Sequence, residues 1–155
     1  MNRLDPRIRI LWIVRSILTA AVLAGIVLGV SRFVDPTWLP GWLPAAVFVG
    51  VGGLGVAFAV LRYRAWRYEV REDSLYLERG VLTRVRTVVP FVRIQHVDTS
   101  RSPTERLVGL ASTVVYTAGS RGADVSVPGL TPSDADDLRE RLKRLAIRSE
   151  GEDAV

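Results

Sequence analysis

The sequence contains no cysteine and a single histidine, His96, in 155 residues. Without cysteine, the chain cannot form a disulfide, a thiolate nucleophile or a cysteine-ligated metal site. One histidine cannot build a metal site that needs two. The sequence also lacks a phosphate-binding loop, a dinucleotide fingerprint and a zinc-protease motif. We therefore expect no cofactor, no metal and no catalytic role.

The net charge of +5 is unevenly distributed along the chain. Residues 1–65 contain seven arginines and two aspartates, whereas residues 66–155 contain equal numbers of basic and acidic side chains. A nucleic-acid-binding protein carries its positive excess on the folded domain. Here the excess flanks apolar runs, the pattern that orients membrane proteins. The distribution argues against a nucleic-acid partner and indicates a protein of the lipid bilayer.

Two apolar runs predict a transmembrane hairpin in residues 1–65, with spans at residues 10–31 and 43–61. The second run has no charged residue and is long enough to cross a hydrocarbon core of about 30 Å. Pro36, Pro40 and Gly41 break the helix between the runs, so the two helices should be antiparallel neighbours. A cleaved signal peptide and two buried helices of a soluble core are the alternatives, and the second span argues against both.

The arginines predict the orientation of the hairpin. Four flank the N-terminal side of the charge-free part of the first run, Ser16–Ser31 (Arg3, Arg7, Arg9, Arg15), Arg32 alone lies in the loop, and four follow the second run (Arg62, Arg64, Arg67, Arg71). Arginine is enriched on the cytoplasmic side of membrane proteins, so both termini and the C-terminal domain should be cytoplasmic. Four tryptophans are candidate anchors at the membrane interfaces: Trp12, Trp38, Trp42 and Trp66.

Small residues at four-residue spacing allow two helix backbones to approach closely. We favour packing within the hairpin as their role, and contact with another membrane protein is the alternative. The residues are Ala21, Gly25 and Gly29 in the first helix, with Ala46, Gly50, Gly53 and Ala57 in the second.

From Trp66 the pattern changes to alternating apolar and polar residues, typical of strands. The pattern predicts an α+β domain over residues 66–148, with six or seven short antiparallel strands and a C-terminal amphipathic helix. The expected strands are residues 66–71, 75–79, 81–89, 93–100, 111–117 and 124–127, with a turn at 119–122. Within 93–100, alternation places Ile94 and His96 on one side and Val97 on the other. Residues 149–155 should form a disordered tail.

The last helix has a start signal and an apolar stripe. Thr131 or Ser133 can cap its first turn beside Pro132. The stripe that should face the sheet consists of Ala135, Leu138, Leu142 and either Leu145 or Ala146.

Several segments resemble the YdbS-like membrane-anchored PH-domain proteins of bacteria and archaea, whose domain was formerly one of unknown function and is now called bacterial PH-like domain 2. The segments are Leu75-Tyr-Leu-Glu-Arg-Gly80, Arg93-Ile-Gln-His-Val-Asp98 and Arg106-Leu-Val-Gly-Leu110. The resemblance covers residues 1–147 and departs modestly at Thr104, where a larger apolar residue is expected. It implies a transmembrane hairpin followed by a PH-like antiparallel β barrel or sandwich.

His96 and three arginines are the candidate functional residues. His96 shares a strand face with Asp98 and Ser100, but no nucleophile motif accompanies them, so we favour a structural hydrogen bond over catalysis. Arg93, Arg101 and Arg106 could bind an anionic lipid headgroup or an acidic partner. We favour ion pairs of these arginines with Asp98 and Glu105, because surfaces of mixed charge are the common case.

Three functions follow from these features. The first is a non-catalytic interaction or assembly module, whose partner is another membrane protein, a related PH-domain protein or a second copy of the chain. The alternative is recognition of anionic lipids or small anions by the domain. The least favoured is a hydrolase that depends on His96.

Overall fold

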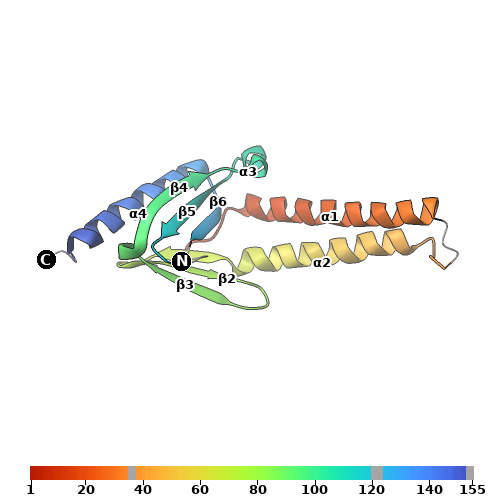
Figure 1. Ribbon diagram of the computed structural model, residues 1–155, viewed down its shortest axis with the longest axis horizontal. Helices are drawn as coiled ribbons and strands as arrows, with labels where there is room; N and C mark the ends of the chain where they lie inside the picture. Colours follow the sequence, from red (N-terminus) through yellow and green to blue (C-terminus); the bar gives the residue numbers. More distant parts are fainter. Residues whose placement is uncertain (35–37, 120–123, 153–155) are drawn as a thin grey trace. The chain divides into compact units, whose positions relative to one another are not determined.

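The computed structural model describes residues 1–34, 38–119 and 124–152 (Figure 1). Contacts divide the chain into two compact units. One is the hairpin unit, Arg9–Leu61, and the other, the domain unit, combines Met1–Ile8 with the chain from Arg62 onward. The elements in order are α1 (Pro6–Phe33), α2 (Leu43–Ala65), β1 (Arg67–Val70), β2 (Ser74–Arg79), β3 (Val85–Pro90), η1 (Phe91–Arg93), β4 (Ile94–Ser100), α3 (Pro103–Val108), β5 (Ala111–Thr117), β6 (Val125–Leu130) and α4 (Pro132–Glu152).

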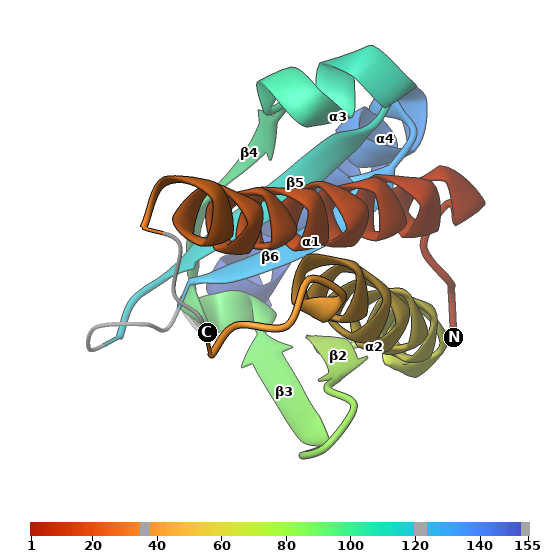
Figure 2. The same ribbon diagram turned by 90° about the vertical axis from the view of Figure 1, so that its right-hand side faces the viewer.

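The helices α1 and α2 lie side by side and are both long and apolar enough to cross a membrane (Figures 1 and 2). Their surfaces are apolar and open: the Leu54 side chain is 76% exposed, and Val22 and Val49 are similarly uncovered. Large exposed apolar side chains are unfavourable in water. In a bilayer they face lipid tails, so this surface suits a membrane hairpin.

The two helices touch through small residues, but at different positions from those we expected. A Cβ atom on Gly55 would lie 2.7 Å from the Ser16 Cβ atom, and one on Gly52 would lie 3.5 Å from the Ala20 Cβ atom. Ala59 is also buried. The contact face of α1 therefore includes Ala20, one position before Ala21, and one position rotates a helix face by about 100°.

The seven small residues assigned to hairpin packing are turned away from this contact. A Cβ atom at Gly25, Gly29, Gly50 or Gly53 would meet nothing within 4 Å. The three alanines of the set, Ala21, Ala46 and Ala57, are exposed. Their spacing is correct for close helix packing, but the hairpin uses another face of each helix.

The domain unit contains two antiparallel three-stranded sheets, ordered β1-β2-β3 and β4-β5-β6. The helix α4 covers the second sheet (Figure 2). It starts where the hydroxyl of Thr131 accepts a hydrogen bond from the Asp134 amide at 3.1 Å. The expected stripe is buried, with Ala146 in place of Leu145 at its end. The largest fully buried side chains of the core include Leu75, Leu77, Phe91, Leu110, Val115, Val127 and Leu142.

Several details differ from expectation. The third strand begins at Val85 instead of residue 81, because Gly80 adopts a φ of +104° and the chain bends before the strand starts. The helix α4 continues to Glu152, into the segment expected to be disordered. Trp66 is only 5% exposed and belongs to the domain core, so it cannot serve as an interface anchor. Pro36 and residues 120–122 of the expected turn lie outside the described residues.

The first eight residues, expected in the hairpin, complete the domain. The Asn2 amide donates a hydrogen bond of 2.7 Å to the Tyr68 carbonyl, and the Tyr68 amide donates one of 3.1 Å to the Asn2 carbonyl. This bridge extends the β1 edge of the first sheet. Leu4 and Ile8 are both buried, and Ile8 packs on Gly129 of β6. Residues 1–8, which include the start of α1, thus contact both sheets of the domain.

Candidate functional site

His96 lies on β4, opposite Tyr116 of β5. The two rings stack with their centroids 4.2 Å apart and their planes 16° from parallel. The Nε2 atom of His96 is 3.9 Å from an Asp98 carboxylate oxygen, and both side chains are exposed. Among the described residues, no serine hydroxyl forms a hydrogen bond with His96. His96 is thus part of an exposed stacked pair next to a carboxylate.

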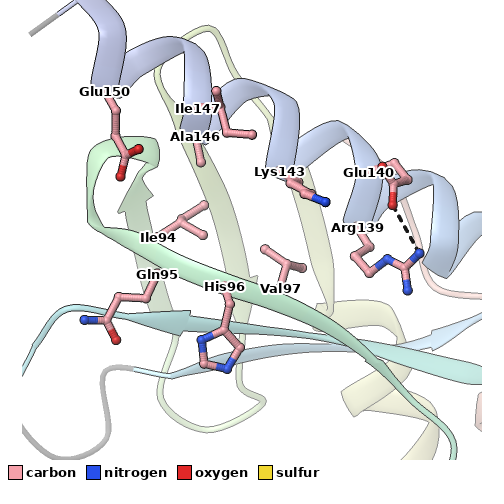
Figure 3. Close-up of a pocket in the computed structure, with 10 residues that line it drawn as sticks. All are labelled: Ile94, Gln95, His96, Val97, Arg139, Glu140, Lys143, Ala146, Ile147 and Glu150. Carbon is pink, nitrogen blue, oxygen red and sulfur yellow. Dashed lines mark hydrogen bonds and ion pairs between the residues drawn. The ribbon is translucent and has the colours of Figure 1, made fainter.

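A groove of about 500 Å³ separates β4 from α4 (Figure 3). Ile94 and Val97 point from β4 toward the helix, where Ala146 and Ile147 complete the apolar part of the groove. The ring of His96 points away from the helix. The groove rim is charged and includes Arg139, Glu140, Lys143 and Glu150.

A bulge explains why Ile94 and Val97 share a side of β4. The strand register shifts between Ile94 and His96. A β-bulge adds one residue to a strand and reverses the alternation beyond it. Simple alternation, which placed Ile94 with His96, was therefore wrong here. The bulge directs Val97 toward α4 and leaves His96 on the outer side.

The three candidate arginines do not converge. Arg93 and Arg101 lie at opposite ends of β4, and eight extended residues span about 26 Å. The Arg101 Nε donates a hydrogen bond of 3.2 Å to the Leu110 carbonyl. Arg106 is on α3. A single anion could not contact all three of these side chains.

The expected ion pairs with Glu105 are also absent from the described residues. Glu105 is 8% exposed, and its carboxylate accepts hydrogen bonds from the Ser102 amide, the Ser102 hydroxyl and the Ser112 hydroxyl. The Ser102 hydroxyl in turn accepts from the Glu105 amide, which completes a capping box at the start of α3. The spacing of serine and glutamate in Ser102-Pro-Thr-Glu105 is the sequence signal for this role.

A second concave surface brings arginines together that sequence reasoning treated separately. This arginine cleft, of about 410 Å³, is lined by Met1, Arg64, Ala65, Arg67, Glu78, Gly80, Arg84 and Arg86. The strand register places Glu78 directly between Arg67 and Arg86. Glu78 forms an ion pair of 3.7 Å with Arg86. In the sequence, Arg64 and Arg67 serve only as orientation signals, because their convergence with Arg84 and Arg86 depends on strand pairing.

The Met1 amino group adds little charge to the arginine cleft, because it is paired with Glu69 at 3.2 Å. Hydrogen bonds from this amino group and from Arg71 lower the pKa of Glu69, so its carboxylate stays ionised. On the same strand, burial raises the pKa of the Tyr68 hydroxyl. The positive charge of the cleft therefore comes from its arginines.

The family of the chain follows from its whole architecture. The bacterial PH domain family matches residues 9–146, a range that includes the hairpin as well as the sheets. The chain belongs to this family. It is a membrane protein with a PH-like domain of the α+β class, as the resemblance implied.

Two relatives from Bacillus subtilis (strain 168) are similar to the chain. The UPF0699 transmembrane protein YdbS is 34% identical over 149 residues, which cover 94% of this chain and 92% of the relative. The UPF0699 transmembrane protein YdbT is 25% identical over 113 residues, which cover 68% of this chain and 23% of YdbT. The chain thus spans about a quarter of the longer relative. No solved structure matches the chain.

Proposed function

We propose that this member of the bacterial PH domain family is a non-catalytic assembly module that binds another membrane protein within the bilayer. The hairpin supplies the contact, and the PH-like domain adds a second surface on the cytoplasmic side. Tethering both surfaces to one membrane raises the effective concentration of each, so weak contacts suffice.

The observation that carries this proposal is the outward direction of the small residues on both helices. Gly25 and Gly29 are open on α1, as are Gly50 and Gly53 on α2. The hairpin does not need them, because Ser16, Ala20, Gly52 and Gly55 already form its contact. Small residues on a lipid-facing surface allow a further helix to approach closely.

The domain offers the groove between β4 and α4 as its contact surface. Its apolar floor is framed by side chains of both charges, an arrangement suited to a protein segment. His96 supports a binding role over catalysis, since its ring is stacked on Tyr116 and contacts no described hydroxyl. This PH-like domain is accordingly a docking element.

The proposed orientation places both termini and the domain in the cytoplasm. Residues 1–8 contact the strands that follow α2, which supports a common side for both ends of the hairpin. The excess of arginine at these ends supports the cytoplasmic side. Trp38 and Trp42 in the opposite loop are exposed, in agreement with a role as anchors at the outer interface.

Single cysteines test the membrane contact, because the natural chain has none. Gly25→Cys places a thiol on the small-residue face of α1. Leu23→Cys is the matched control, exposed and rotated by about 200° from that face. In intact membranes, a photoactivatable thiol reagent on Gly25→Cys should give one crosslinked product of discrete mass, and a disulfide-linked dimer if the partner is a second copy.

A bulky substitution provides the second half of the test. On native gels run in mild detergent, the band of the complex should be lost for Gly25→Leu and retained for Leu23→Ala. Equal crosslinking from positions 23 and 25, or crosslinks to lipid alone, would contradict the proposal.

A further inference from the structure

The arginine cleft concentrates positive charge, although residues 66–155, which supply three of its four arginines, are neutral as a whole. Four arginines line the cleft with a single carboxylate, Glu78. Glu78 is paired with Arg86, and none of the other three arginines has an ion pair among the described residues. Guanidinium groups that share a concave surface repel one another unless an anion lies between them. The cleft therefore has the charge of an anion-binding site.

The position of Arg64 along the chain indicates where that anion is found. Arg64 is in the last turn of α2, three residues after Leu61, where the apolar run ends. Three residues of helix advance by about 4.5 Å. A side chain at this distance from the end of a span reaches the headgroup layer of the bilayer. The cleft thus begins where lipid phosphates are dense.

The loop between β2 and β3 forms the other wall of the cleft. Gly80 has a positive φ, and a Cβ atom there would collide with the Thr83 carbonyl. This tight turn is compatible only with glycine and sets the path of the chain to Arg84. In the same loop, between Gly80 and Arg84, the Leu82 side chain is 93% exposed. An apolar side chain beside arginines suits the boundary between headgroups and acyl chains.

We propose that the arginine cleft binds the phosphate-bearing headgroup of an anionic lipid in the leaflet next to the end of α2. Arginine is well suited to phosphate, because its planar fork of donors matches two phosphate oxygens. The residues that bind are Arg64, Arg67, Arg84 and Arg86, which differ from the arginines first considered for this role. The site does not depend on the protein partner of the hairpin.

Native mass spectrometry of the full-length chain in detergent tests the site. The delipidated protein is titrated with phosphatidylglycerol, with phosphatidylcholine and with inorganic phosphate. We expect the wild type to retain phosphatidylglycerol selectively. The triple variant Arg67→Gln/Arg84→Gln/Arg86→Gln should bind it on the order of a hundredfold more weakly, since each basic residue contributes about fivefold near a membrane surface.

The matched control removes the same charge elsewhere. Arg93→Gln/Arg106→Gln/Arg144→Gln changes three exposed arginines outside the cleft and should bind phosphatidylglycerol within about twofold of wild type. Equal weakening of both triple variants would show general charge attraction and would overturn the site. Binding of inorganic phosphate as tight as binding of the lipid would also overturn it, in favour of a free anion.

A second measurement needs no variant. A photoactivatable phosphatidylglycerol analogue is incorporated into nanodiscs with the wild-type chain and crosslinked, and the modified peptides are mapped. Labelling should fall on the segment from Arg64 to Arg67 and the segment from Gly80 to Arg86. Labelling confined to other segments would overturn the proposal even if the triple variant failed to fold.

Discussion

In the hairpin unit, large apolar side chains such as Val22, Val49 and Leu54 are exposed, whereas Leu75, Leu77 and Val115 in the domain unit are fully buried. The same kinds of residue thus occupy opposite environments in one chain. The domain excludes water by packing its own side chains, and the hairpin relies on lipid to cover its apolar surface. Stability in the two units therefore depends on different residues, and matched substitutions can measure the difference.

The largest contrast is expected between Leu77→Ala and Leu54→Ala. Leu77 is 0% exposed, so its truncation leaves a cavity and should lower the free energy of unfolding of the domain by about 3 kcal/mol. Leu54 loses contacts with lipid alone, and its truncation should change stability by about 0.5 kcal/mol or less. Denaturant titrations in detergent measure both. An equal loss of unfolding free energy in the two variants would show that the hairpin surface around Leu54 is covered by protein.

A second pair tests the boundary between the units. Ile8 is 2% exposed and packs on Gly129, whereas Ile10, two residues further along α1 and in the hairpin unit, is 55% exposed. Ile8→Ala should destabilise the domain by about 2 kcal/mol and weaken hydrogen-exchange protection of the Tyr68 amide. Ile10→Ala should leave that protection unchanged. If both substitutions are neutral, the first eight residues do not stabilise the domain.

The third pair tests which faces of the helices touch. An alanine at position 55 meets the Ser16 side chain, whereas an alanine at position 53 meets open space. Both Gly→Ala changes raise helix propensity by about 1 kcal/mol, so their difference isolates the clash. Gly55→Ala should be less stable than Gly53→Ala by about 1–2 kcal/mol. Spin-label distances between α1 and α2 should increase for Gly55→Ala alone, and the reverse order would place the contact on the other face.

The smallest contrast compares two serines. Ser102 caps α3 through its bonds with Glu105, and Ser102→Ala should cost the domain about 1 kcal/mol. The Ser31 hydroxyl donates to the Leu28 carbonyl within α1, a bond that stabilises a helix little, so Ser31→Ala should be neutral within about 0.5 kcal/mol. Thermal unfolding followed by circular dichroism distinguishes them. A neutral Ser102→Ala would mean that the capping box is dispensable.

Features set by local pattern were predictable from the sequence. The uncharged run from Leu43 to Leu61 lies within α2, and the stripe through Ala135, Leu138 and Leu142 is the buried face of α4. The spacing of apolar residues and the absence or presence of charged residues determine such features within a single helix or strand. The family resemblance was likewise recognisable from short motifs, and the family match confirms it.

Features that depend on contacts between distant segments were not predictable. The bulge at Ile94 changed the direction of Val97, and burial removed Trp66 from the membrane interface. The convergence of Arg67 and Arg86 required the register of three strands. The small-residue spacing identified faces suited to packing but could not show which face meets the neighbouring helix.

The bridge between Asn2 and Tyr68 has a consequence for how the protein is made. The segment that completes the first sheet is synthesised before the hairpin, and its partner strand is synthesised after it. The first sheet therefore cannot be completed until α1, α2 and β1 have all left the ribosome. Leu4 and Ile8 likewise reach the domain core only after the strands that follow α2 have been synthesised, so the domain unit completes its fold after the whole hairpin unit has been made.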